Sequence, residues 1–171
     1  VHADVPLVGD VKRTLPLLTE RIRPRDHSAW IEEFCACDRI EYERVVRRAI
    51  RPDGGRIRMG EAVDAVARAY DRDAVMVTDV GQQQMFAARY FGFRRSRSLV
   101  TSGGLGTMGY SIPAALGAKL ARPNREVVAI CGDGAFQMSM CELGTIAQNH
   151  IGVKIIIMRN TRLGMVRELQ D

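Results

Sequence analysis

An aspartate and an asparagine, Asp133 and Asn160, are the two side chains of this sequence best suited to joint chemistry. Asp133 lies in the GDG run 132–134, directly after the apolar residues 127–131, and Asn160 follows a second apolar run, residues 153–158. A carboxylate and a carboxamide oxygen are hard oxygen donors of the kind that Mg²⁺ takes as ligands. A helix that begins after the GDG run would direct free N–H groups and its positive end to the same point, which favours an anion. If the two side chains meet, they can bind a metal ion together with a diphosphate.

The elements around these residues predict that they do meet. The apolar, β-branched runs 127–131 and 153–158 are typical of strands buried on both faces of a sheet. Between them, residues 136–149 predict one helix, because their apolar side chains recur at helical spacing. A strand–helix–strand unit makes its two strands parallel, so their carboxyl ends lie at one edge of the sheet, where open α/β sheets bind ligands. We therefore expect the aspartate and the asparagine side by side at that edge.

Four ordered motifs decide between this interpretation and a simpler one. An isolated Asp-Gly pair is usually an ordinary turn, and an isolated Asn is usually a helix cap. Here the motifs are TDVGQQQMFAARYF, TSGGLGTMGYSIPAALGAKLA, GDGAFQMSMCELGTIAQ and NTRLGMVRELQ. GDG followed by Asn resembles the thiamine diphosphate motif of the thiamine-dependent enzymes. Together the four resemble the catalytic large subunit of acetohydroxyacid synthase, also called acetolactate synthase, strongly over residues 75–171 and weakly before them.

The resemblance implies both a fold and a set of site residues. The expected fold is a doubly wound, mostly parallel α/β sheet with helices on both faces, truncated at its C-terminus. Mg²⁺ would be held by Asp133, Asn160 and the main-chain oxygen of Arg162. The residues implied to bind thiamine diphosphate are Gly81, Gln82, Gln83, Gly106, Met108, Gly132, Asp133, Gly134, Ala135, Asn160, Gly164, Met165 and Val166.

Some of these positions have more specific implied roles. Gln83 stands where family members often carry His, and either side chain can donate a hydrogen bond. The glycines around Met108 would let backbone carbonyls approach the aminopyrimidine, and Met108 itself would hold the cofactor bent. Met165, Val166 and Leu169 would line the substrate space. Leu169 stands where many members carry a Trp that favours 2-oxobutyrate, so we expect a weaker preference for 2-oxobutyrate over pyruvate.

The implied function is that of part of an acetolactate synthase, a transferase. That enzyme condenses pyruvate with pyruvate or 2-oxobutyrate, with loss of CO₂, in branched-chain amino acid biosynthesis. In full length it would bind FAD, form a homodimer or tetramer with a regulatory small subunit, and act in the cytoplasm. The glutamate that activates the cofactor belongs to a domain outside this chain, so the chain would hold no catalytic residue and be inactive alone. Glu61 and Glu142 are expected to be exposed or capping helical carboxylates.

Two alternatives stay open from the sequence. Other thiamine enzymes, such as pyruvate oxidases or 2-oxoacid decarboxylases, share the GDG and Asn pattern. A non-catalytic nucleotide-binding or subunit-interaction module is also compatible, since Gly104, Gly106 and Gly109 match GxGxxG. A dinucleotide site also needs an acidic residue about 20 positions further on, at the end of the next strand. Glu126 instead begins that strand, and Asp133 lies inside the GDG run.

Composition excludes several classes of function. The chain has 171 residues and a formal net charge of +5, with its densest basic cluster at Arg94, Arg95 and Arg97. No aromatic platform or nucleic-acid motif accompanies that cluster, which favours a solvated loop over a DNA or RNA site. The four cysteines show no zinc pattern, and Cys131 is expected inside a buried strand. No apolar run reaches the roughly 18 residues that a membrane span needs.

The chain is expected to contain three segments. Residues 1–22 would be the tail of a central domain, with a strand at 5–8 and a helix that Asp10 caps. Residues 23–58 would be a linker, and residues 59–171 an incomplete thiamine diphosphate domain. The absence of an initiator Met and the helical pattern at the end suggest a piece of a longer protein. The other expected elements are helices at 28–36, 40–50, 59–70, 82–90, 110–121 and 161–170 and strands at 74–78 and 99–101, with Asp79 as a cap or turn carboxylate.

Overall fold

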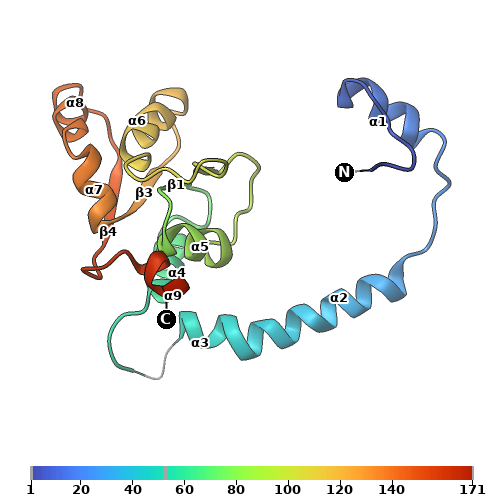
Figure 1. Ribbon diagram of the computed structural model, residues 1–171, viewed down its shortest axis with the longest axis horizontal. Coiled ribbons are helices and arrows are strands. Elements are labelled where there is room, and N and C mark those ends of the chain that lie inside the picture. Colours follow the sequence, from blue (N-terminus) through green and yellow to red (C-terminus); the bar gives the residue numbers. More distant parts are fainter. Residues whose placement is uncertain (1, 52–53, 171) are drawn as a thin grey trace. The chain divides into compact units, whose positions relative to one another are not determined.

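A four-stranded parallel sheet organises the larger part of this protein (Figure 1). The computed structural model describes residues 2–51 and 54–170, and the chain divides into two compact units, Val1–Ile40 and Glu41–Asp171. The sheet lies in the second unit. Its strands, in spatial order, are β2 (Leu99–Thr101), β1 (Val75–Thr78), β3 (Val127–Gly132) and β4 (Lys154–Met158). Each neighbouring pair runs parallel, which confirms the predicted fold class.

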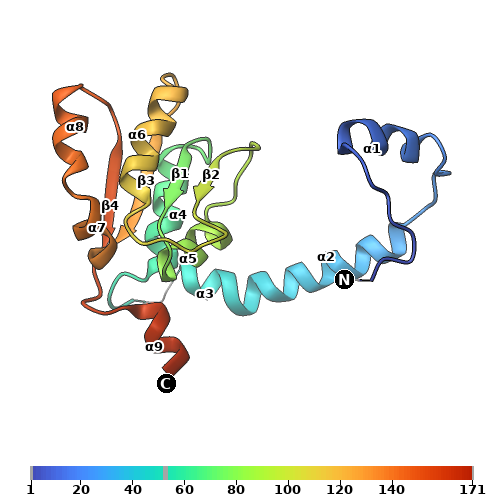
Figure 2. The ribbon, with the colours of Figure 1, turned by 45° about the horizontal axis from the view of Figure 1, so that its top comes forward.

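Helices cover both faces of the sheet. Along β1, Met76 faces one apolar cluster while Val75 and Val77 face the other, as the alternation of side chains along a strand requires. On the first face pack α4 (Met59–Ala69) and α5 (Gln82–Tyr90), and on the second α6 (Ser111–Ala121). Next to α6 lie α7 (Asp133–Ser139) and α8 (Glu142–Gln148), as Figure 2 shows. The core therefore consists of two apolar layers, one on each side of the strands.

The strand order creates a crevice at the carboxyl edge of the sheet. From β1 the chain passes through α5 to β2, and from the adjacent β3 it passes through α7 and α8 to β4 on the opposite side. The loops that leave β1 and β3 thus diverge in opposite directions. Such a switch point is where doubly wound sheets bind ligands. The loop after β1 contains Gly81, and β3 ends at Gly132.

Most of the predicted elements of the second unit are confirmed. The helix at 82–90 and the strand at 99–101 have the predicted bounds, and the helices at 59–70 and 110–121 and the strand at 74–78 differ by a residue at one end. The last helix, α9 (Gly164–Gln170), begins three residues later than predicted, at the glycine itself. The turn before it contains Thr161 in the left-handed region, with φ of 57°.

The single helix predicted for residues 136–149 is wrong, because the segment forms α7 and α8 separately. At the break, the N–H of Leu143 donates to the carbonyl of Met140, and that of Gly144 to the carbonyl of Cys141. These are three-residue spacings, which tighten the turn and interrupt the α-helical ladder. The run 153–158 does form a strand, but β4 is only half-buried because, in the described residues, it pairs with β3 alone.

Two expectations for the first part of the chain are also wrong. Residues 5–8 form no strand, and Val5 and Val8 are 79% and 94% exposed. A strand needs a neighbour to satisfy its backbone groups, and within the described residues this segment has none. The two helices expected at 28–36 and 40–50 are replaced by α2 (Ser28–Glu41), the π-helix η1 (Tyr42–Val46) and α3 (Arg47–Ile50), which follow one another directly. The first helix, α1 (Val11–Thr19), is confirmed, with Asp10 accepting from the N–H of Lys12 at 2.9 Å.

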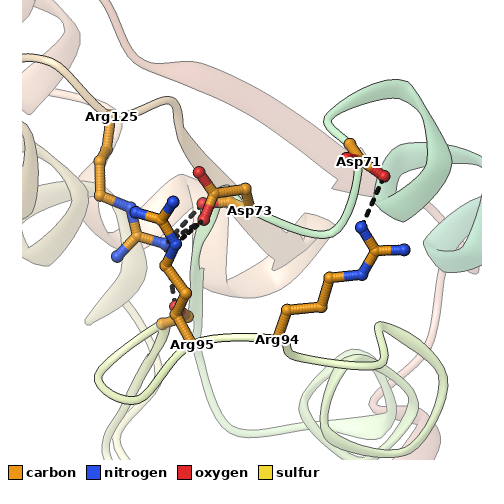
Figure 3. Close-up of polar contacts among 6 residues, drawn as sticks. Asp71, Asp73, Arg94, Arg95 and Arg125 are labelled. Carbon is orange, nitrogen blue, oxygen red and sulfur yellow. Dashed lines mark hydrogen bonds and ion pairs between the residues drawn. The ribbon is translucent and has the colours of Figure 1, made fainter.

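The basic cluster lies at the amino edge of the sheet, in the loop between α5 and β2. Arg94 pairs with Asp71 and Arg95 with Asp73, each at 2.9 Å (Figure 3). Both arginine side chains are more than half exposed. These contacts agree with the predicted solvated loop, since the charges of Arg94 and Arg95 are matched by carboxylates of the same edge.

Candidate functional site

A cavity of about 160 Å³ lies at the carboxyl edge of the sheet, at the switch point between β1 and β3. Most of its lining comes from loops that follow strands, as the topology predicts. The residues that line it are Met59, Val80, Gly81, Gln82, Gln83, Met108, Gly132, Asp133, Gly134, Ala135, Met158, Asn160, Arg162, Leu163, Gly164, Met165 and Val166.

Asp133 connects the loop after β3 to the loop after β4. Its Oδ1 accepts from the N–H of Gly134 at 3.0 Å, and its Oδ2 accepts from the N–H of Thr161 at 2.9 Å. Thr161 directly follows Asn160, so the carboxylate and the carboxamide lie in neighbouring turns. The predicted meeting of Asp133 and Asn160 at one edge is therefore confirmed. Each carboxylate oxygen keeps a further lone pair, which a cation can use.

Asn160 is held by contacts at both ends of its amide. Its Oδ1 accepts from the N–H of Arg162 at 3.0 Å, and its Nδ2 donates to Oε1 of Gln82 at 3.4 Å. The side chain of Gln82 in turn donates through Nε2 to Oε1 of Glu168, at 2.7 Å. The start of α5 is thus tied to both ends of the segment that carries Asn160 and α9.

Glycines keep the floor of the cavity open. Gly81 has φ of 143°, and a Cβ there would lie 2.8 Å from Nε2 of Gln83, so neither backbone nor space admits a side chain. A Cβ on Gly134 would lie 3.4 Å from Cε of Met108. The end of the Met108 side chain therefore lies near the GDG turn. The backbone of Gly134 has no side chain of its own to cover it.

Gln83 is the buried polar side chain of the site, with 5% exposure. Its Nε2 donates to the carbonyl of Val80 at 3.1 Å, which fixes the amide against its own turn. A Cβ on Gly132 would lie 3.5 Å from the same nitrogen. Gln83 therefore fills the space between the loops after β1 and β3, and its second N–H remains available as a donor.

Of the residues predicted to bind cofactor, all but Gly106 line the cavity, and Arg162 of the predicted metal set lines it as well. Gly106 lies behind Val80 with φ of 62°, and a Cβ there would lie 3.3 Å from a methyl group of Val80. Leu169 does not line the cavity and is 85% exposed. The roles assigned to these residues remain proposals.

Four lining residues were missing from the predicted set: Met59, Val80, Met158 and Leu163. Three of them have a sequence signal, because they adjoin or lie within the motifs around the predicted residues. Met59 has none. It begins α4, and only the packing of that helix against the sheet brings it to the cavity.

The remaining carboxylates behave as structural groups. Asp79, predicted as a cap or turn carboxylate, is fully buried and accepts two hydrogen bonds from Ser111 at the start of α6. Glu61 accepts from the N–H of Arg58 at 3.4 Å, and Glu142 lies in the first turn of α8. Among the described residues, no group of three or more His, Cys, Asp or Glu could hold a metal ion. A cation at Asp133 must therefore rely on amide and main-chain oxygens as well.

The thiol of Cys131, near the end of β3, has a pKa that is shifted mainly by burial. Cys131 is fully buried in β3, as predicted. Burial, and after it the nearby charge of Asp79, raise the pKa of the thiol, a hydrogen bond with Ser111 lowers it, and together they bring the pKa to about 11. A raised pKa and full burial favour the neutral thiol near pH 7. No helix within the described residues has the length and apolar character needed to cross a membrane.

Comparison with known proteins identifies the sequences that this chain is similar to. The model of the family described as "Thiamine pyrophosphate enzyme, C-terminal TPP binding domain" matches residues 79–171. The acetolactate synthase large subunit of Lactococcus lactis is 38% identical over 172 residues, covering 100% of this chain and 29% of that protein.

Two further relatives give the same picture. The isozyme 2 large subunit of acetolactate synthase from Escherichia coli K12 is 41% identical over 176 residues, covering 99% of this chain and 30% of the relative. The mitochondrial acetolactate synthase catalytic subunit of Aspergillus candidus is 39% identical over 179 residues, covering 100% of this chain and 25% of the relative. The chain thus spans less than a third of the length of these relatives.

Proposed function

We propose a function from one premise: this chain belongs to the thiamine pyrophosphate enzymes, whose C-terminal TPP binding domain it contains. The chain acts as part of an acetolactate synthase and binds the metal–diphosphate end of thiamine diphosphate. The observation that carries the proposal is the contact of Asp133 with the turn of Asn160, which places two oxygen donors of neighbouring loops beside one glycine-lined cavity.

The residues present fit a magnesium ion. Asp133 supplies a carboxylate, Asn160 a carboxamide oxygen and Arg162 a main-chain oxygen, all hard donors. Their loops border the same cavity. The contact of the Asn160 Oδ1 with the N–H of Arg162 brings the last two together. We assign these three residues to the metal.

The same cavity suits a diphosphate and the ring next to it. Gly81, Gln82 and Gln83 border it from the start of α5, and the free N–H of Gln83 is a donor for an anion. Gly132, Gly134 and Ala135 line it from the GDG turn. Because no Cβ covers either glycine, a phosphate can approach the backbone closely.

Apolar residues cover the remaining wall. Met108 lines the cavity beside the GDG turn and supports the bend of the cofactor, while Met165 and Val166 of α9 line the substrate side. When bound, thiamine diphosphate supplies the carbanion chemistry, and the protein binds it, orients it and excludes water. In this assignment Gly106 acts indirectly, by holding Val80 at the cavity, and Gly164 leaves room for the amides beside it.

The proposed reaction joins two 2-oxoacids, pyruvate with pyruvate or with 2-oxobutyrate, with loss of CO₂, as in branched-chain amino acid biosynthesis. The glutamate that activates the cofactor, the FAD site, the homodimer or tetramer and the regulatory small subunit belong to the full-length enzyme, in the cytoplasm. The chain alone forms no acetolactate. Leu169 stands where many family members carry Trp, so we expect a weaker preference of the full-length enzyme for 2-oxobutyrate over pyruvate, even though Leu169 is 85% exposed and lies outside the cavity lining of this chain. Competition between the two acceptors measures this preference.

Calorimetric titration of the chain with thiamine diphosphate, with and without Mg²⁺, tests the proposal. We expect binding that requires Mg²⁺ and is lost in Asp133→Ala. Asp71→Ala is the matched control, because that aspartate lies at the opposite edge of the sheet and is 86% exposed. Binding that ignores Mg²⁺ and survives Asp133→Ala would favour a nucleotide module instead. If the chain binds nothing, the same titration on the full-length protein decides.

A further inference from the structure

Three side chains from distant parts of the sequence form a continuous hydrogen-bonded path beside the cavity, here called the Gln82 bridge. Oε1 of Glu168 accepts from Nε2 of Gln82 at 2.7 Å, and Oε1 of Gln82 accepts from Nδ2 of Asn160 at 3.4 Å. Glu168 lies on α9, Gln82 begins α5, and Asn160 follows β4. The bridge therefore connects three elements that the strand order alone does not join.

The chemistry of the three groups gives the bridge a direction. An ionised carboxylate can only accept hydrogen bonds, whereas each carboxamide has one accepting and one donating end. Glu168 therefore requires the NH₂ end of Gln82 to face it. The oxygen of Gln82 is then left for Asn160, which must present its own NH₂ end. As a result Oδ1 of Asn160 faces away from Gln82, where it accepts from the N–H of Arg162.

Gly164 shows that the bridge occupies space that a side chain at this position could enter only by displacing the amides. A Cβ at this position would lie 2.6 Å from Cδ of Gln82 and 2.9 Å from Nδ2 of Asn160. The φ of Gly164 is not in the left-handed region. A side chain at this position is therefore opposed by the two amides in their present places and not by the backbone conformation. The Gln82 bridge is packed against the backbone of α9 where that helix begins.

From this geometry we propose that Glu168 is a positioning residue for the metal, acting through Gln82 on the carboxamide of Asn160. The inference rests on the proposed function, in which Oδ1 of Asn160 binds Mg²⁺. A reversed amide would offer the metal an NH₂ group, which is not a ligand. Glu168 does not contact the metal, but by fixing Gln82 it leaves Oδ1 of Asn160 for the metal. The position of α9, which carries Glu168, is thereby coupled to the affinity for Mg²⁺.

The test compares Glu168→Ala and Glu168→Gln with the unchanged chain. Glu168→Gln keeps an oxygen that can accept from Gln82 but removes the charge, whereas Glu168→Ala removes both. Glu126→Ala is the matched control, because it also loses an exposed contact, the 3.1 Å pair with Lys154, but at the opposite edge of the sheet. Loss of either exposed contact is expected to leave folding intact.

The first readout is the Kd for Mg²⁺ in the presence of thiamine diphosphate, by calorimetry. Loss of a group that orients a metal ligand typically costs about 10- to 100-fold in affinity. We expect at least a tenfold rise in Kd for Glu168→Ala, a partial recovery in Glu168→Gln, whose oxygen can accept from Gln82 but whose amide does not enforce the direction of the bridge, and no change in Glu126→Ala. Equal weakening in both Glu168 variants would show that the charge of Glu168, and not its hydrogen bond to Gln82, sets the affinity for Mg²⁺. Unchanged affinity in Glu168→Ala would show that the Gln82 bridge has no effect on that affinity. Either result overturns the proposal.

The second readout needs no ligand. The side-chain amide signals of Asn160 and Gln82 are followed by ¹⁵N NMR in the chain without metal. Both pairs of signals shift in Glu168→Ala and stay in place in Glu126→Ala if the bridge exists. Unmoved signals overturn it. If the unchanged chain binds no Mg²⁺ but its amide signals respond to Glu168→Ala, the metal assignment fails while the bridge itself stands.

Discussion

The carboxylate of Asp79 accepts two hydrogen bonds from Ser111, one from its backbone N–H at 2.7 Å and one from its hydroxyl at 2.6 Å. Asp79 follows β1 and Ser111 is the first residue of α6. Both residues are fully buried. The pair joins the end of a central strand to the start of the helix on one face of the sheet.

We expect Asp79→Ala to lower the free energy of unfolding by about 3 kcal/mol, because it leaves two buried donors of Ser111 without a partner. Urea unfolding, followed by circular dichroism, measures the loss. Glu61→Ala is the comparison, since its contact with the N–H of Arg58 is longer, at 3.4 Å, and more exposed. Its loss should cost about 1 kcal/mol or less. Equal losses in the two variants would contradict the role assigned to Asp79.

Asp79 also marks how far the sequence alone could be interpreted. Its position between a strand and a glycine predicts a cap or turn carboxylate. The structure gives Asp79 such a role at the start of α6, whereas the adjoining α5 has no side-chain cap. The partner Ser111 could not be predicted, because the contact depends on how α6 packs against the sheet. The contact between Gln82 and Glu168 has the same origin. Local patterns therefore predict the elements and the loops that meet, but not the side-chain pairs that join them.

The wrong predictions have a related cause. Residues 5–8 have the apolar, β-branched character of a strand but lack a neighbour to pair with, so the local signal is not realised. The apolar spacing of residues 136–149 fits one helix, and nothing in the periodicity reveals the tight turn at Met140. Parallel strands, in contrast, follow from the helices between them, which is why the edge that carries Asp133 and Asn160 could be predicted; the strand order itself could not.

Arg125, at the amino edge of the sheet, provides a second test of how much a buried polar contact contributes to stability (Figure 3). Its guanidinium donates to Oγ of Ser98 at 2.9 Å and to the main-chain carbonyl of Asp73, and its side chain is only 18% exposed. Ser98 is buried. We expect Arg125→Ala to lower the free energy of unfolding by about 2 kcal/mol, because buried groups lose a charged partner.

Arg94→Ala is the control for this variant. Arg94 pairs with Asp71 at 2.9 Å in the same region, but its side chain is 60% exposed. Exposed ion pairs contribute roughly 0–1 kcal/mol. Parallel urea titrations of the two variants should therefore separate clearly, and the loss in Arg94→Ala should shrink at high salt. A larger loss in the free energy of unfolding for Arg94→Ala than for Arg125→Ala would refute the argument that burial makes the contacts of Arg125 the stronger ones.

The buried thiol predicts how stability depends on alkaline pH. The pKa of Cys131 is raised from its usual 9.0 to about 11 in the folded protein, so the folded state holds this proton more tightly than the unfolded state. Its contribution to stability is complete below about pH 9 and is lost as the pH rises through about 11. Unfolding titrations across this window should show a smaller decline for Cys131→Ala than for the unchanged protein. An equal decline would contradict the raised pKa.

Thiol labelling gives an independent measurement of the same burial. Cys35, Cys37 and Cys141 are exposed, whereas Cys131 is buried. At pH 8 we expect a thiol reagent to modify the three exposed cysteines rapidly and Cys131 only after unfolding, because the thiolate is the reactive form. Peptide mapping after a short exposure identifies the modified residues. Rapid labelling of Cys131 in the folded chain would be incompatible with the structure.

Two glycines should respond differently to the same substitution. Gly117 lies inside α6 and is exposed, and a Cβ there would meet nothing within 4 Å. Gly117→Ala should raise the free energy of unfolding by about 0.5–1 kcal/mol, because glycine is the less favourable residue inside a helix. A Cβ at Gly164 would instead displace Gln82 from Asn160.

We therefore expect Gly164→Ala to weaken Mg²⁺-dependent binding of thiamine diphosphate by about tenfold, the scale found when a metal ligand loses the group that orients it. Its stability should change by less than about 1 kcal/mol, because the displaced atoms belong to the end of a flexible, partly exposed side chain. Calorimetry measures the affinity and urea unfolding the stability, with Gly117→Ala carried through both. If Gly164→Ala keeps the affinity of the unchanged chain, the cavity tolerates displacement of the Gln82 amide, and the steric need for glycine has no consequence for the metal.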